Sequence, residues 1–252
     1  MNTLFQAFIS HPDFRKLDFS ECKLTVVGGM AATPETAKRW LEITGLPILE
    51  GWGMSETLGV GTANPFDGTE YTGNVGLPLP GVDISIRNDE DEVLGLNEVG
   101  EMCIKGDNVI TTYHNIDNAK FFTADGYLKT GDIASMNEQG SIKIYDRKKD
   151  MIIVSGFNVY PNEVENVIET HPKVAECSVV GIADKSQGQS VKAYIVKADE
   201  NLIAEDIKML CKENLAGYKC PRHIEFIDEL PKSNVGKILR HELRKGANIA
   251  EI

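Results

Sequence analysis

Four short polar clusters in the sequence combine residue types that can bind a nucleotide, its phosphates and a divalent cation. Each contains or adjoins a glycine or a charged side chain, so backbone and side chains can both approach a ligand. They span, in chain order, residues 51–57, 127–132, 146–150 and 231–237. Motif matches of this kind become informative when several occur together, so the four clusters favour one extended binding site.

The first cluster contains side chains suited to a base and a phosphate. Trp52 offers a flat face on which a base can stack, and Gly53 permits a sharp turn after a strand. Ser55 can donate a hydroxyl hydrogen bond to a phosphate oxygen, and Glu56 is a carboxylate suited to holding Mg²⁺ beside it. An ordinary strand-to-loop turn with a surface glutamate fits the same residues and stays an alternative.

The second and third clusters contain a carboxylate and a guanidinium that fit a ribose. Asp132 follows Thr130-Gly131, and a carboxylate at a glycine turn can accept both hydroxyls of a 2′,3′-diol. Arg147 carries a planar fork that suits ribose or phosphate oxygens. The alternatives are an aspartate that caps a turn and a charged, solvated loop over 146–150.

The fourth cluster ends in Lys237, directly after Gly236. A compact ammonium on a long stem can neutralise charge that develops on a transferring phosphoryl group. The alternative is a lysine at the start of a helix, where the helix dipole disfavours a positive charge. The pair Gly28-Gly29, at the end of an apolar strand, would let a planar base lie against the backbone.

The sequence patterns around these residues predict the elements that position them: an α/β stretch, then a set of antiparallel strands, then an α+β stretch. Thr33 as N-cap, Pro34 at the first helical position and Gly45 after the last turn mark one helix. In residues 1–76 we also expect a helix at 3–9 and strands at 24–27 and 47–50, followed by a turn at 51–53. This strand–helix–strand unit is typical of an α/β layer.

Short segments of period two follow and predict a small antiparallel barrel or distorted sheet over 77–147. We expect its strands at 82–86, 100–104, 126–128 and 141–145. In the remaining α+β part we expect helices at 162–170, at 204–214 and from near residue 237, and strands at 176–181, 190–196 and 223–227. The charged run at 148–150 predicts a boundary between a large domain, 1–147, and a small domain, 148–252.

The composition narrows the class of protein. The chain has 252 residues and a net charge of −12, which argues against nucleic acid as a partner and against tight docking on an anionic membrane. Weak peripheral membrane contact stays an alternative. The five cysteines are scattered, with no metal-ligand spacing, which predicts reduced, mostly buried thiols. No leader pattern and no bilayer-length apolar run occurs, so we expect a cytoplasmic protein.

The four clusters and their order resemble those of the adenylate-forming superfamily, which includes acyl-CoA synthetases, luciferases and adenylation domains of peptide synthetases. Over about residues 1–246 the chain looks most similar to the C-terminal half of bacterial long-chain fatty acid–CoA ligases. The stretches that carry this likeness are 2–5, 17–20, 128–134, 146–152, 154–163 and 229–240. The superfamily usually has tyrosine and threonine where this chain has Trp52 and Ser55.

The resemblance implies a two-step reaction with a fatty acid, ATP, Mg²⁺ and coenzyme A. A carboxylate attacks the α-phosphate of ATP, and the CoA thiol then attacks the acyl-AMP while AMP leaves. It makes Lys237 the lysine that supports adenylation, and Lys149 the pivot about which the small domain, a mobile AMP-binding C-terminal domain, rotates. The loop at Gly156 would line the channel for the CoA arm.

The resemblance also assigns the nucleotide contacts. It puts Asp132 and Arg147 on the ribose of AMP, and the Gly28-Gly29 turn near adenine and the acyl carbonyl. Ser55 and Glu56 would face the phosphates, with Glu56 as the Mg²⁺ ligand.

The family's phosphate-gripping loop, rich in Ser, Thr and Gly and containing lysine, does not occur in the sequence. We therefore expect the chain alone to be inactive, and residues 1–75 to expose apolar surface that favours self-association. It would be an excised piece, a truncated reading frame or a split gene product. Two alternatives stay open: a non-catalytic module that retains AMP or CoA affinity, and an adenylating ligase for another carboxylic acid.

Overall fold

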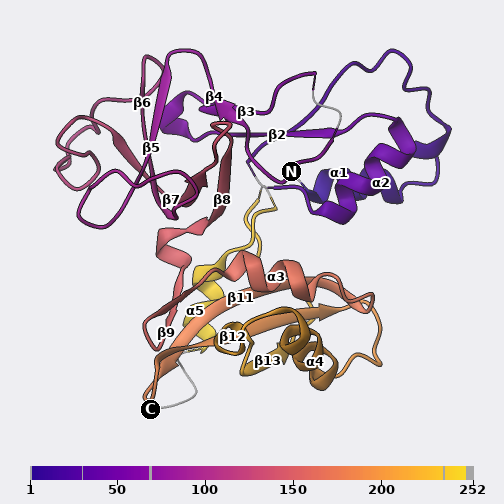
Figure 1. Ribbon diagram of the computed structural model, residues 1–252. Coiled ribbons are helices and arrows are strands. Elements are labelled where there is room, and N and C mark those ends of the chain that lie inside the picture. The colour runs from indigo at the N-terminus through magenta and orange to yellow at the C-terminus, as the bar shows by residue number, and fades with distance from the viewer. Residues whose placement is uncertain (1, 30, 68–69, 235, 248–252) are drawn as a thin grey trace. The chain divides into compact units, whose positions relative to one another are not determined.

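The computed structural model describes residues 2–29, 31–67, 70–234 and 236–247 (Figure 1). The chain divides into two compact units, Met1–Ile144 and Tyr145–Ile252. The division falls before Tyr145, so Arg147 lies in the second unit, and the expected domain boundary after residue 147 stays a prediction. We describe each unit separately.

The first unit begins with an α/β layer. Its sheet has the order β1-β2-β3-β4, with β1 parallel to β2 and the other pairs antiparallel. Its elements are α1 (Asn2–Ser10), the 3₁₀ helix η1 (Phe14–Lys16), β1 (Thr25–Val27), α2 (Pro34–Thr44), β2 (Ile48–Trp52), the 3₁₀ helix η2 (Ser55–Thr57), β3 (Thr62–Ala63) and β4 (Leu77–Pro78). The helices α1 and α2 pack together (Figure 1) through aromatic residues that include Phe5 and Trp40, whose rings meet edge to face.

The helix α2 has the ends that the sequence predicted. Thr33 Oγ1 accepts the backbone N–H of Thr36 at 3.3 Å, and Gly45 closes the last turn in the left-handed region. On the sheet, Val27 is buried whereas Val26 is 52% exposed. The exposed apolar surface expected in this region is therefore present at the strand β1, and self-association through it stays a prediction.

The rest of the first unit is built on a second sheet, of order β5-β6-β7-β8. Its strands are β5 (Val82–Arg87), β6 (Gly100–Gly106), β7 (Leu128–Met136) and β8 (Ile142–Arg147), and the division between the units falls within β8. Met102, Ile104 and Leu128 form its core. Over the described residues β5 and β8 are the two ends of this order, so the sheet is open, which matches the distorted sheet that the sequence offered as an alternative to a small barrel.

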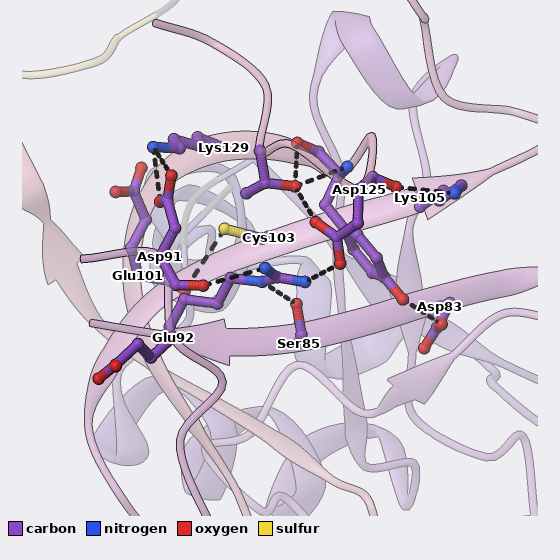
Figure 2. Close-up of polar contacts among 12 residues, drawn as sticks. Asp83, Ser85, Asp91, Glu92, Glu101, Cys103, Lys105, Asp125 and Lys129 are labelled. Carbon is purple, nitrogen blue, oxygen red and sulfur yellow. Dashed lines mark hydrogen bonds and ion pairs between the residues drawn. The ribbon is translucent and has the colours of Figure 1, made fainter. Parts of the chain in front are cut away.

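A polar network fastens loops onto this second sheet (Figure 2). The buried guanidinium of Arg87 donates to Ser85 Oγ at 2.9 Å and to Asp125 Oδ2 at 2.6 Å. Lys129 lies 2.6 Å from Asp91, and both can be followed in Figure 2. Arg87 and Lys129 lie on strands, whereas Asp125 and Asp91 lie in the loops that precede β7. Their contacts therefore hold these loops against the sheet.

The second unit is a sheet with helices on both faces. The strand order is β10-β9-β12-β11, and β13 pairs in parallel with β12. Its elements are the 3₁₀ helix η3 (Lys148–Asp150), β9 (Ile152–Val154), β10 (Phe157–Val159), α3 (Pro161–Ile168), β11 (Val174–Asp184), β12 (Gly188–Lys197), α4 (Ala204–Asn214), the 3₁₀ helix η4 (Gly217–Lys219), β13 (His223–Phe226) and α5 (Arg240–Ala247).

Successive side chains of β11 and β12 alternate between the two faces of the sheet, and each face is covered by helices. Val179 and Ile195 point into a core that includes Val164 of α3 and Ile207 of α4. The neighbours Val180 and Tyr194 belong to a separate cluster with Leu243 of α5. Because successive strand residues face opposite sides, α3 and α4 cover one face of the sheet and α5 covers the other.

Three sequence expectations about element boundaries were wrong, and one hairpin was missed. The strand β2 continues through Trp52, so the turn starts at Gly53. Asp132 lies inside β7 beside a bulge, because pairing with β6 carries the chain past Gly131. The hairpin of β9 and β10 was not foreseen, and the last helix starts at Arg240, so Lys237 precedes it.

The cysteines fit the expectation of reduced, mostly buried thiols. All five cysteines are free thiols, with Cys103, Cys177 and Cys211 buried. Within the described ranges no helix is both long and apolar enough to cross a membrane.

Candidate nucleotide-binding site

The turn after β2 is held by close backbone packing around Gly53. A Cβ atom at Gly53 would lie only 2.0 Å from the carbonyl oxygen of Gly59. The Gly61 N–H donates to the Trp52 carbonyl at 2.8 Å, and the Gly59 N–H donates to the Met54 carbonyl at 3.0 Å. The close approach at Gly53 is therefore an intramolecular requirement of the loop, as the sharp turn expected there implies, and its role beside a ligand stays a prediction.

Glu56 is fixed on η2 by two partners that the sequence did not suggest. Tyr113 Oη donates to Glu56 Oε1 at 2.9 Å, and the Glu56 carbonyl accepts the Ile110 N–H at 2.9 Å. Burial and then the bond to Glu56 raise the pKa of Tyr113 to about 12, so it remains a donor. Ser55, on the same turn, is exposed to solvent.

The donor set around Glu56 is compatible with Mg²⁺. No group of three or more His, Cys, Asp or Glu side chains is placed to hold a metal ion within the described residues. Mg²⁺ commonly uses one or two carboxylates and completes its shell with water and substrate phosphates. A single carboxylate, engaged through Oε1 by a neutral hydroxyl, fits that role.

Asp132 and Trp52 lie far apart in sequence and meet directly. The indole Nε1 of Trp52 donates to Asp132 Oδ2 at 2.8 Å, and Asp132 is buried. The bulge before Asp132 is shaped by Gly131, whose N–H donates to Glu101 Oε1 at 3.1 Å and whose φ of 72° favours glycine. Thr130 Oγ1 donates to the Met102 carbonyl at 2.7 Å. The fold thus brings the first two clusters together.

Glu50 is a buried carboxyl group that sequence reasoning missed. It is 4% exposed on β2, and its Oε1 accepts the Ala32 N–H at 3.2 Å. Tyr71 Oη donates to the Ala32 carbonyl at 2.6 Å. Burial raises the pKa of Glu50 from 4.5 to about 7. The signal in the sequence was a lone charged residue after the apolar Ile48-Leu49.

The glycine pair at the end of β1 has room around it. A Cβ at Gly28 would approach the Gly51 carbonyl oxygen to 3.6 Å, an ordinary contact. Gly29 has a φ of 80° and open space around it. The turn therefore needs a glycine at position 29 for its backbone conformation, and Gly28 is sterically replaceable.

In the second unit the candidate side chains project outward. Arg147 at the end of β8 and Lys149 on η3 are exposed. Ser155 and Gly156 form the two-residue turn of the β9–β10 hairpin, with φ values of 51° and 85°. Two positive φ angles match a type I′ turn, so hairpin geometry by itself accounts for Gly156.

Lys237 is exposed on a short turn that closes on itself. The Ser233 N–H donates to the Lys237 carbonyl at 2.8 Å, and the Leu239 N–H donates to the Pro231 carbonyl at 2.8 Å. Gly236 has a φ of 76°, which this turn requires. Lys237 thus lies before α5, between described residues that are hydrogen-bonded to one another, and outside a helix.

Beside this turn lies a buried ionic cluster that the sequence did not suggest. Arg240 Nη2 donates to Glu165 Oε2 at 2.5 Å and to Asn162 Oδ1 at 2.7 Å. Its Nη1 lies 3.6 Å from Asp146 Oδ1 and 3.8 Å from Asp150 Oδ2. The cluster joins α3, the end of β8 and η3 to the first turn of α5, which is distant from them in sequence. Local sequence patterns therefore could not reveal it.

Comparison with known proteins yields two matching family models. A family model described as AMP-binding enzyme matches residues 1–114, and one described as AMP-binding enzyme C-terminal domain matches residues 163–237. A long-chain-fatty-acid–CoA ligase of Yersinia pestis is 46% identical over 245 residues, covering 97% of this chain and 44% of the relative. A feruloyl-CoA synthase of an Amycolatopsis species is 35% identical, and the match covers 96% of this chain and 50% of the relative.

Solved structures extend this likeness to the fold. The anthranilate CoA ligase AuaEII in complex with anthranoyl-AMP matches with a TM-score of 0.86 and 32% identity, over 99% of this chain and 49% of that protein. The chain spans about half the length of the curated relatives that it matches. Two family models in the expected order, high identity and a shared fold lead to one conclusion: the chain belongs to the adenylate-forming family of AMP-binding enzymes.

Proposed function

We propose that this chain is the C-terminal part of an AMP-forming ligase that activates long-chain fatty acids with ATP and coenzyme A. The direct contact of Trp52 with Asp132 supports it, because it joins two clusters that a nucleotide site would need together. The 46% identity to a long-chain-fatty-acid–CoA ligase supports the substrate class. We place the ligase in the cytoplasm, with weak peripheral contact with the inner membrane as a further possibility to test by cell fractionation.

In the proposed reaction the fatty carboxylate attacks the α-phosphorus of ATP, and pyrophosphate leaves as acyl-AMP forms. The CoA thiolate then attacks the acyl carbonyl, and AMP leaves as the acyl-CoA thioester forms. A carboxylate is a poor electrophile and a mixed anhydride is a good one, which is why activation precedes the thioester. Mg²⁺, held at Glu56, would neutralise phosphate charge.

Each candidate residue has a separate task in this proposal. Asp132 and Arg147 bind the ribose hydroxyls, and Ser55 donates to a phosphate oxygen. Lys237 stabilises the charge that develops at the α-phosphate. Because CoA must approach the same carbonyl, the segment that carries Lys237 leaves by rotation at Lys149. Gly156 then lies along the CoA arm, and the turn at Gly28-Gly29 lies beside adenine.

The test supplies the part of the enzyme that the chain does not contain. The segment that precedes the matched region in the Yersinia pestis relative is fused to residues 1–252, and palmitoyl-CoA formation is measured with ATP and CoA. We expect activity from the fusion, none from the chain alone, and a loss of about 100-fold or more in adenylation with Lys237→Ala. Activity of the chain alone, or an active fusion that tolerates Lys237→Ala, would contradict the proposal.

A second candidate is a ligase for an aromatic acid, which the likeness to a feruloyl-CoA synthase favours. Calorimetry with the chain and two acyl-AMP analogues, one carrying palmitoyl and one carrying feruloyl, separates the two. Binding of AMP or CoA alone, with an inactive fusion, would instead support a non-catalytic module.

A further inference from the structure

Arg240 is a largely buried cation close in sequence to the candidate catalytic residue Lys237, and its side chain is 19% exposed. It opens α5 and follows Lys237 by three positions. Its guanidinium donates to Glu165 at 2.5 Å and to Asn162 at 2.7 Å, both on α3. Its Nη1 also approaches Asp150 on η3, which a second guanidinium, that of Arg244, contacts as well.

The acceptors of Arg240 are themselves fastened to the backbone. Glu165 Oε1 accepts the Val179 N–H of β11 at 2.7 Å. Asp146 accepts the Arg147 N–H and the Asn162 N–H, each at 2.8 Å. Arg240 is therefore tied through Glu165 and Asn162 to the central sheet and to the start of α3.

The chain order divides these contacts at the expected pivot. Asn162 and Glu165 follow Lys149, so a rotation at Lys149 leaves their bonds to Arg240 intact. The approach to Asp146, which precedes Lys149, is longer at 3.6 Å. The shorter contacts of Arg240 itself thus lie within the part that would move, whereas the 2.8 Å bond from the Asn162 N–H to Asp146 spans the pivot and would open on rotation.

The described residues of the turn that presents Lys237 are anchored by an apolar contact and an ion pair. Leu230 is buried and Ile238 packs against the cluster that contains it. Lys232, on the same turn, is exposed and pairs with Glu176 at 2.6 Å. The Arg240 guanidinium is a further anchor at the end of the turn, since its Nη2 donates to both Glu165 and Asn162, and charge-assisted bonds of this kind are strong.

We propose that Arg240 is a positioning residue: it fixes the Lys237 turn to α3, so that the turn moves with the small domain as one rigid piece and presents its ammonium for adenylation. This inference rests on the proposed function for the roles of Lys237 and Lys149. The conservative variant Arg240→Lys keeps the positive charge and loses the planar fork.

The first experiment separates the two half-reactions in the fusion protein. In Arg240→Lys, we expect ATP–pyrophosphate exchange to fall by about tenfold in kcat with little change in KM. Thioester formation from supplied palmitoyl-AMP should change by less than about twofold, because Lys237 has left by then. Lys192→Met, which removes the Lys192–Glu225 pair at 2.8 Å in the same unit, is the control and should leave both rates near those of the parent.

An equal fall in both half-reactions would reduce Arg240 to a structural residue, and no change in either would refute the proposal. If the parent fusion catalyses neither half-reaction, the proposed function fails, and hydrogen exchange on the 252-residue chain decides on the positioning role. We expect the Gly236 and Leu239 amides to exchange about tenfold faster in Arg240→Lys, with the β11–β12 amides unchanged. Faster exchange at all amides alike, or no change at the Gly236 and Leu239 amides, would refute the positioning role.

Discussion

In the first unit the candidate residues Trp52 and Asp132 bond each other, and Glu56 is held by Tyr113. In the second unit Lys149 and Lys237 are exposed, while their neighbours Asp150 and Arg240 make the buried contacts. Side chains of the first unit would therefore serve both the fold and the ligand, whereas the second unit divides these tasks between adjacent residues. Substitutions should then affect stability very differently in the two units.

The largest effect is expected from Gly53→Ala. The new Cβ would lie 2.0 Å from Gly59 O and 2.7 Å from Val60 Cα, both backbone atoms. We expect a loss of at least about 3 kcal/mol in the unfolding free energy of the first unit. The only two tryptophans, Trp40 and Trp52, lie in this unit, so their fluorescence during denaturation reports it.

Gly28→Ala is the matched control, because its nearest contact would be 3.6 Å away. A change within about 0.5 kcal/mol is expected. Similar losses in the two variants would show that the clash at Gly53 can relax.

Glu50→Gln should change the pH dependence of the first unit. Burial raises the pKa of Glu50 from 4.5 to about 7, so the folded state binds this proton more tightly than the unfolded state. The stabilising contribution is full below pH 4.5 and is lost as the pH rises through about 7. Relative to the parent, the variant should gain up to about 3 kcal/mol between about pH 5 and pH 8. Tryptophan-monitored urea titrations at the two pH values measure it, and a pH-independent difference would contradict it.

Trp52→Phe keeps an aromatic ring and removes one hydrogen bond to the buried Asp132. We expect a loss of about 2 kcal/mol in the first unit, measured by calorimetry because a fluorescent reporter is removed. AMP affinity of the fusion should fall as well, since the carboxylate loses an orienting partner. An unchanged melting temperature would show that other Asp132 contacts suffice.

The smallest effects belong to Lys149→Ala and Lys237→Ala, both at exposed side chains. Each should change the stability of the second unit by less than about 0.5 kcal/mol, measured by circular dichroism during urea denaturation. A loss above about 1 kcal/mol in either would end the distinction between the two units.

Local signals in the sequence were sufficient for many elements. The helix α2 was predicted because Thr33, Pro34 and Gly45 act on backbone groups within one turn. The helix α4 was predicted over the observed residues, Ala204–Asn214, from its apolar spacing. The hairpin at Ser155-Gly156 was missed, although its two-residue turn could have signalled it.

The residues that were missed depend on contacts distant in sequence. Glu50, Tyr113 and Arg240 find their partners 18, 57 and 75 positions away. No propensity or local spacing encodes such a meeting, because register and packing determine it. The placement of Asp132 inside β7 was missed for the same reason, since pairing with β6 extends the strand through the glycine.

The sequence by itself determined the family, the order of the clusters and the residue types that could bind a nucleotide, because these depend on side-chain chemistry and short spacing. Tertiary structure alone decided which of those side chains also hold the fold. Trp52 reaches Asp132 across 80 positions, and Arg240 reaches Glu165 across 75. Losing such a buried contact is costly, because the polar group left behind cannot form a replacement hydrogen bond with water.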